Sequence, residues 1–137
     1  MMLMLEDVRD LVSSLGFTDD SCVYMGKLDA KQDKSIGVYN LKRSAPYTVA
    51  IGGKDKESYG TKQVSILIHW NRSMRDTEAV SMVLFNRLSE VREVKINEKQ
   101  IKFIHPLVDQ PVDVGTDDNG IYEMVIEIEL IYERKGD

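Results

Sequence analysis

Gln63-Val-Ser-Ile-Leu-Ile-His-Trp70 is the clearest strand in this sequence. Its side chains are expected to alternate between two faces, because successive residues of a strand point to opposite sides. One face carries Val64, Ile66, Ile68 and Trp70, and the other carries Ser65, Leu67 and His69. Since both faces hold apolar residues, we expect this strand in the middle of a sheet.

The longest strand is predicted over Gly120–Arg134, after the tight-turn signal Asn119-Gly120. Its apolar face consists of Tyr122, Met124, Ile126, Ile128, Leu130 and Tyr132. The opposite face carries glutamates, among them Glu123, Glu127 and Glu129. This alternation is typical of an antiparallel strand with one covered face. The glutamates are either the solvated face of the strand or the lining of a shared channel, and the sequence does not choose between the two.

Three shorter elements are predicted before the central strand. An amphipathic helix is expected over Met4–Leu15, and Gly16 is placed to end it. Cys22–Leu28 and Ile36–Leu41 are expected to be strands that form a hairpin with a polar tip.

A second helix is expected after the central strand, with Ser73 or Asp76 as its N-cap. Its wide apolar stripe predicts burial on more than one side and consists of Ala79, Val80, Met82, Val83, Leu84, Phe85, Leu88 and Val91. A further strand over Ile101–Leu107 either lies at an edge or ends at Pro106.

These elements predict a single α+β domain over residues 1–137. We expect a small antiparallel or mixed sheet of about four to five strands, with two helices packed on one face. The core is expected to contain Ile66, Ile68, Val83, Leu84, Leu88, Ile126 and Ile128.

Composition argues against several functions. The 137 residues carry a formal charge of −5, which disfavours binding to nucleic acid by phosphate neutralisation. The single cysteine, Cys22, excludes an internal disulfide and a multi-thiolate metal site. Cys22, His69 and His105 lack the surroundings of a nucleophile and base. We therefore expect no enzymatic activity, no catalytic, cofactor or metal site, and no association with a membrane.

Two local patterns resemble ligand sites only superficially. The acidic segment Asp109–Asn119 does not match the calcium-loop pattern and is interpreted as a solvated hairpin loop. Gly52-Gly53-Lys54 lacks the second glycine and the Lys-Ser or Lys-Thr pair of a phosphate loop.

The segment Lys42–Thr61 is long for a connection inside a compact domain. It is interrupted by glycines, yet it contains Tyr47, Val49, Ile51 and Tyr59. An isolated domain gains little from exposing such apolar groups, whereas an oligomer can bury them at a subunit boundary.

One pattern is familiar, and it runs through Ile36-Gly-Val-Tyr-Asn40, Tyr47, Ile51-Gly-Gly53, Glu57-Ser-Tyr-Gly60 and Gln63–Arg72. With the helix that follows, it resembles the tail terminator and minor capsid proteins of tailed bacteriophages and prophages. The resemblance covers roughly Ile36 to Tyr132. It implies a structural protein that forms a hexameric ring, caps the end of the tail tube and provides the surface for joining the head.

The resemblance also implies partners, a location and contact residues. The partners would be further copies of the chain, the tail tube protein and a head-side connector or stopper, with DNA passing through the ring without specific binding. The location would be a virion or phage-tail-like particle assembled in the bacterial host cytoplasm. The positions most like the family are Gly52, Gly53, Ser58, Tyr59 and Arg72. We expect them, with Tyr47, Val49 and Ile51, to contact a neighbouring subunit or the tube.

Other functions remain open at this point. The chain could be another head–tail connector, such as a stopper or tail completion protein. It could also be a small ligand- or peptide-binding α+β module with the long segment as a lid, or an enzyme with an unrecognised site.

Overall fold

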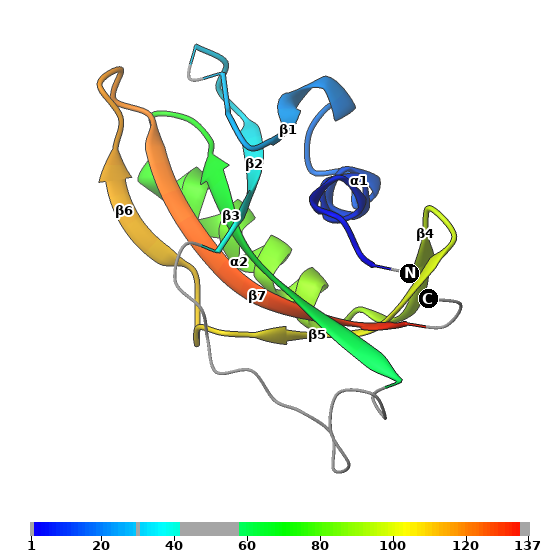
Figure 1. Ribbon diagram of the computed structural model, residues 1–137. Coiled ribbons are helices and arrows are strands. Elements are labelled where there is room, and N and C mark those ends of the chain that lie inside the picture. Colours follow the sequence, from blue (N-terminus) through cyan, green and yellow to red (C-terminus); the bar gives the residue numbers. More distant parts are fainter. Residues whose placement is uncertain (1, 30, 42–57, 135–137) are drawn as a thin grey trace.

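The computed structural model describes residues 2–29, 31–41 and 58–134. The elements are α1 (Leu5–Ser14), η1 (Asp20–Cys22), β1 (Val23–Met25), β2 (Ser35–Asn40), β3 (Tyr59–His69), α2 (Met74–Ser89), β4 (Arg92–Ile96), β5 (Lys99–Pro106), β6 (Val112–Thr116) and β7 (Tyr122–Glu133). Within these residues the strands form one curled, mixed sheet in the order β1-β2-β3-β7-β5-β4, and β6 pairs with β7 (Figure 1). The α+β class is therefore confirmed.

The two strands that the sequence indicates most strongly lie side by side at the centre of the sheet. β3 and β7 are antiparallel, and their register pairs Tyr59 with Glu133 at one end and His69 with Glu123 at the other. β3 begins at Tyr59, so the last residues of the predicted loop Lys42–Thr61 belong to the sheet. β5 ends at Pro106, which confirms one of the two expectations for that proline.

The predicted hairpin of the first two strands is wrong, because β1 and β2 pair in parallel. The register places Val23 beside Ile36 and Met25 beside Val38. Gly26 leaves β1 with a φ of 86°, in the left-handed region that glycine favours.

The sheet has seven strands in the described residues, and the prediction of four to five is wrong. The two missed strands, β4 and β6, are short, with five residues each, and each has only two alternating apolar residues: Val94 and Ile96, and Val112 and Val114. β4 joins β5 through Asn97 and Glu98, whose φ angles of 50° and 67° are those of a tight hairpin turn without the usual glycine. All five residues of β6 are exposed, so neither of its faces belongs to the core.

Both helices form where expected. Gly16 follows the C-cap of α1 with a φ of 79°, and the Ser73 hydroxyl of α2 accepts a hydrogen bond from the Asp76 amide at 3.1 Å. α1 contacts β1, β2 and β4, whereas α2 contacts β3, β5 and β7 (Figure 1). The two helices thus pack against different strands, and their arrangement as one layer on one face stays a prediction.

Six of the seven predicted core residues are buried, with at most 1% of their surface exposed: Ile66, Ile68, Leu84, Leu88, Ile126 and Ile128. Val83 is 51% exposed, so its assignment to the core is wrong. The buried positions of α2 are Thr77, Ser81, Leu84 and Leu88. These positions form one narrow stripe along the helix. The prediction that the wide apolar stripe of α2 is buried on more than one side is therefore wrong.

Candidate interaction surface

The face of the central strands that points away from the core is half-exposed. We call it the outer face. It is carried by alternate residues, and the register aligns Tyr39, Ser65 and Glu127 in one row across β2, β3 and β7. The next row aligns Gly37, Leu67 and Val125. Because apolar and acidic groups lie together on this face, it is suited to a mixed contact with a partner.

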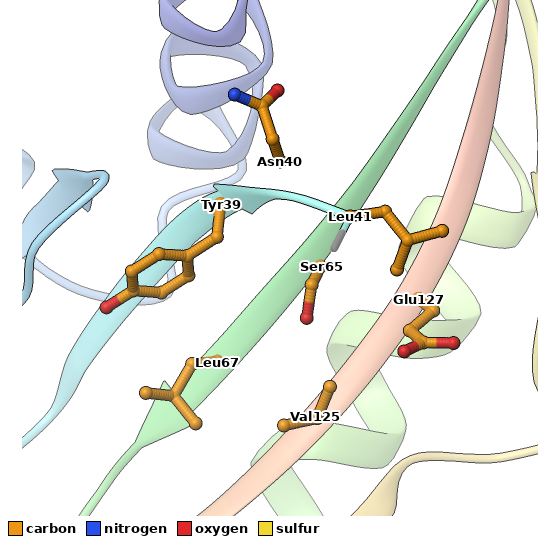
Figure 2. A pocket seen from close by; sticks show the side chains of 7 residues that line it. All are labelled: Tyr39, Asn40, Leu41, Ser65, Leu67, Val125 and Glu127. Carbon is orange, nitrogen blue, oxygen red and sulfur yellow. The ribbon is translucent and has the colours of Figure 1, made fainter. Parts of the chain in front are cut away.

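A groove of about 470 Å³ lies on the outer face. It is lined by Tyr39, Asn40, Leu41, Ser65, Leu67, Val125 and Glu127. Figure 2 shows the ring of Tyr39 beside Leu67 and Val125 on the far side of Leu67, while Leu41 and Glu127 lie at the other end and the Asn40 side chain points away. The walls are mainly apolar and Glu127 supplies a carboxylate, so the groove can accept an apolar group that carries a hydrogen-bond donor or a positive charge.

Gly37 explains the position of one wall of the groove. The ring of Tyr39 folds over Gly37, and a Cβ at that position would lie 2.6 Å from a ring carbon. Burial raises the pKa of Tyr39, the nearby Glu123 carboxylate adds to the rise, and a hydrogen bond with the Leu28 backbone opposes it. The tyrosine ring is thus a packed wall of the groove. The sequence interpretation noted apolar residues on both faces of β3 but did not assign Tyr39, Leu41 or Leu67 to a site.

The three glutamates that the sequence singled out share the outer face and have different surroundings. The Glu123 carboxylate lies 2.8 Å from His69 Nδ1. Glu129 accepts a hydrogen bond from the Gln63 side chain at 2.9 Å. Glu127 lines the groove. Glu123 and Glu129 therefore take part in cross-strand contacts between β3 and β7.

The predicted contact residues are only partly placed by the structure. Five of them, Tyr47, Val49, Ile51, Gly52 and Gly53, lie outside the described residues. Ser58 and Tyr59 are exposed at the start of β3. Arg72 is exposed beyond the other end of β3, where its Nε donates to the Asn119 carbonyl at 3.1 Å. The structure therefore does not bring Arg72 together with Ser58 and Tyr59.

Tyr59 belongs to a second apolar patch, which the sequence interpretation missed. This patch has a cavity of about 360 Å³ lined by Tyr59, Arg92, Glu93, Lys102, Phe103 and Ile131. Tyr59 is 48% exposed and Phe103 is 40% exposed. Lys102 lies 6.0 Å from the centre of the Tyr59 ring and 2.6 Å from Glu93. The available signal in the sequence was the pair Phe103-Ile104, because two successive apolar residues of a strand point to opposite faces.

His69 is fully buried between two carboxylates at the end of β3. Glu123 approaches its Nδ1 at 2.8 Å, and Asp117 lies 3.7 Å from its Nε2. These three residues are close enough to be considered as metal ligands. One nitrogen of His69 and one oxygen of each carboxylate lie within 4.8 Å of one another. The arrangement fits a contact that joins the β6–β7 turn to β3.

Asp117 also organises that turn. Its Oδ1 accepts hydrogen bonds from the amides of Asn119 and Ile121, both at 2.9 Å. Burial alone would raise the pKa of Asp117, but these two amides and the neighbouring His69 and Arg72 lower it. The acidic segment Asp109–Asn119 is therefore not a simple solvated loop, because it contains β6 and because the Asp117 carboxylate stabilises the β6–β7 turn.

Comparison with known proteins identifies the class. Residues 11–134 match the family model described as "Bacteriophage tail terminator protein". The chain belongs to the bacteriophage tail terminator family, a family of phage tail structural proteins that are associated with the virion. No curated protein and no solved structure in the comparison matches it. In the described parts of the chain, no helix has the length and apolar character needed to span a membrane.

Proposed function

We propose that this chain forms a ring that caps the end of the phage tail tube and provides the surface to which the head or collar is joined. The observation that carries the proposal is the family match over residues 11–134. The partners are further copies of the chain in a hexamer, the tail tube protein and a head-side connector or stopper protein. Assembly takes place in the host cytoplasm, and the chain is not an enzyme.

The charge of the chain is consistent with a ring through which DNA moves. Six copies of a chain with charge −5 carry a formal charge of −30. An acidic passage repels phosphates and so keeps DNA from adhering to the wall. Glu123, Glu127 and Glu129 are the proposed acidic lining, and Glu127 is the one placed in an open groove.

The patch at Tyr59 is the proposed contact surface for a neighbouring subunit or the tube. It holds the partly exposed side chains of Tyr59 and Phe103 next to charged ones. Such a composition is typical of contacts between proteins, where aromatic anchors carry much of the binding energy. The contribution proposed for Tyr47, Val49, Ile51, Gly52 and Gly53 rests on the sequence alone.

The test is electron microscopy of particles produced with and without this gene. If the chain is a terminator, its loss yields tails of uncontrolled length that lack heads, and the wild-type gene supplied separately restores particles of uniform length. Tails of normal length that fail only at head joining would indicate a stopper or tail completion protein instead. Normal particles without the gene would contradict the proposal.

A ligand-binding module is the second candidate, and the 470 Å³ groove favours it because its volume is in the range of small-molecule sites. Gly37→Ala forces the Tyr39 ring to move and should therefore close or distort the groove. If a screened small molecule raises the melting temperature of the wild type but not of Gly37→Ala, and particles form normally without the gene, the module is the better description.

A further inference from the structure

The side of α2 that faces away from the sheet has an unexpected apolar centre. Ala79, Met82 and Val83 are exposed there, and Val83 leaves 51% of its surface uncovered. At about 100° per residue, these three fall within a sector of about 100° that also contains Arg75, Asn86 and Glu90. We call these six residues the outward face of α2.

The outward face has a symmetric order of residues along the helix. Arg75 lies seven positions before Met82, and Glu90 lies seven positions after Val83. Ala79 and Asn86 lie three positions before and after the same central pair. If two copies of α2 cross antiparallel at Met82 and Val83, each Arg75 lies at the height of the partner's Glu90, and small Ala79 lies at the height of Asn86. The face is therefore complementary to itself in charge.

The two charges are not explained by α2 itself. Arg75 is in the first turn and Glu90 is the C-cap, so both oppose the helix dipole, which favours acidic groups at the N-terminus and basic groups at the C-terminus. Neither side chain makes an ion pair or hydrogen bond with any other residue that the structure describes. An antiparallel partner helix would place each beside an opposite charge.

We propose that the outward face of α2 is a contact between two copies of this chain, related by a two-fold axis. The contact goes beyond the proposed ring and does not depend on it. A cyclic ring needs a contact between two different surfaces, whereas a two-fold contact uses the same surface twice. Because only three apolar residues are involved, the association is weak and is seen at high protein concentration.

Charge reversal gives a sharp test by sedimentation over a range of concentrations. Arg75→Glu places two acidic pairs across the contact and Glu90→Arg places two basic pairs, so each variant alone should associate at least about tenfold more weakly than the wild type. An equimolar mixture of the two variants restores opposite charges at both pairs, and its association should return to the wild-type level.

Two further variants serve as controls. Val83→Asp should abolish the association, while Lys95→Glu, a charge reversal at an exposed site on β4, should not change it. Circular dichroism should show that all variants remain folded. The proposal is wrong if the wild type is monomeric at every concentration, if the single reversals associate normally, or if the mixture is not restored. A hexamer that is unaffected by these variants would overturn this contact and leave the ring proposal intact.

Discussion

Asp7 is a buried carboxylate that holds α1 against the hairpin of β4 and β5. It is 2% exposed and lies 2.6 Å from Lys99 Nζ and 2.9 Å from the Asn97 side-chain amide. Asp7→Ala leaves Lys99 without its acceptor, while the Asn97 amide keeps only its hydrogen bond to Asp10, and removing one partner of a buried ion pair is strongly destabilising. We expect a loss of about 3 kcal/mol in the free energy of unfolding, measured by urea denaturation. Glu6→Ala, on the same turn, is the control and should change it by less than about 0.5 kcal/mol.

The same residue predicts a pH dependence. Burial alone would raise the pKa of Asp7, but its hydrogen bonds from Lys99, Asn97 and the Met4 amide outweigh burial and lower it from 3.8. A carboxyl whose pKa is lowered by folding stabilises the folded state. This stabilisation is complete when the pH is above the pKa of the carboxyl in the unfolded chain, and it is lost as the pH falls through the pKa in the folded chain. The stability difference between wild type and Asp7→Asn should therefore shrink below about pH 4. A difference that is constant from pH 7 to pH 2.5 would contradict this.

The core and the exposed side of α2 can be separated by two substitutions. Leu88 is 1% exposed, so Leu88→Ala should lower the free energy of unfolding by about 2–5 kcal/mol through lost burial and a cavity. Val83→Ala removes methyl groups from a half-exposed side chain and should cost less than about 1 kcal/mol. Equal losses for the two variants would mean that the helix presents a different face to the sheet.

At the level of elements, the β6–β7 turn is stabilised by hydrogen bonds to Asp117 and not by the adjacent Asp118. Asp117 accepts two backbone hydrogen bonds and lies beside His69, whereas Asp118 is exposed. Asp117→Ala should speed hydrogen exchange at the amides of Asn119 and Ile121 about tenfold or more, because the loss of a hydrogen bond costs about 1–3 kcal/mol. Asp118→Ala is the matched control and should leave both rates unchanged.

At the level of the whole molecule, assembly and stability should respond differently to changes on the outer face. Tyr59 is 48% exposed, so Tyr59→Ala should leave the melting temperature nearly unchanged. If Tyr59 is a contact anchor, the same variant should weaken assembly onto tail tubes by about 2 kcal/mol, which is roughly thirtyfold in affinity. Met25→Ala, which truncates a 51% exposed residue on β1, is the control and should assemble normally. Normal assembly of Tyr59→Ala would place the contact elsewhere.

The sequence by itself determined the elements whose apolar period is strong. The alternation in β3 and β7, the Ser73 cap and Gly16 are local signals, because each depends on residues close together in the chain. The resemblance that begins at Ile36 also indicated the family, which the match over residues 11–134 confirms.

Only the tertiary structure decided the rest, because it depends on residues far apart in the chain. The parallel pairing of β1 and β2 and the presence of β4 and β6 follow from partners elsewhere in the sheet. The groove combines Tyr39, Leu67 and Val125 from three strands that no local pattern connects. Val83 is apolar and helical but exposed, because only one side of α2 packs against the sheet. The apolar pattern of the helix does not determine how many of its sides are buried.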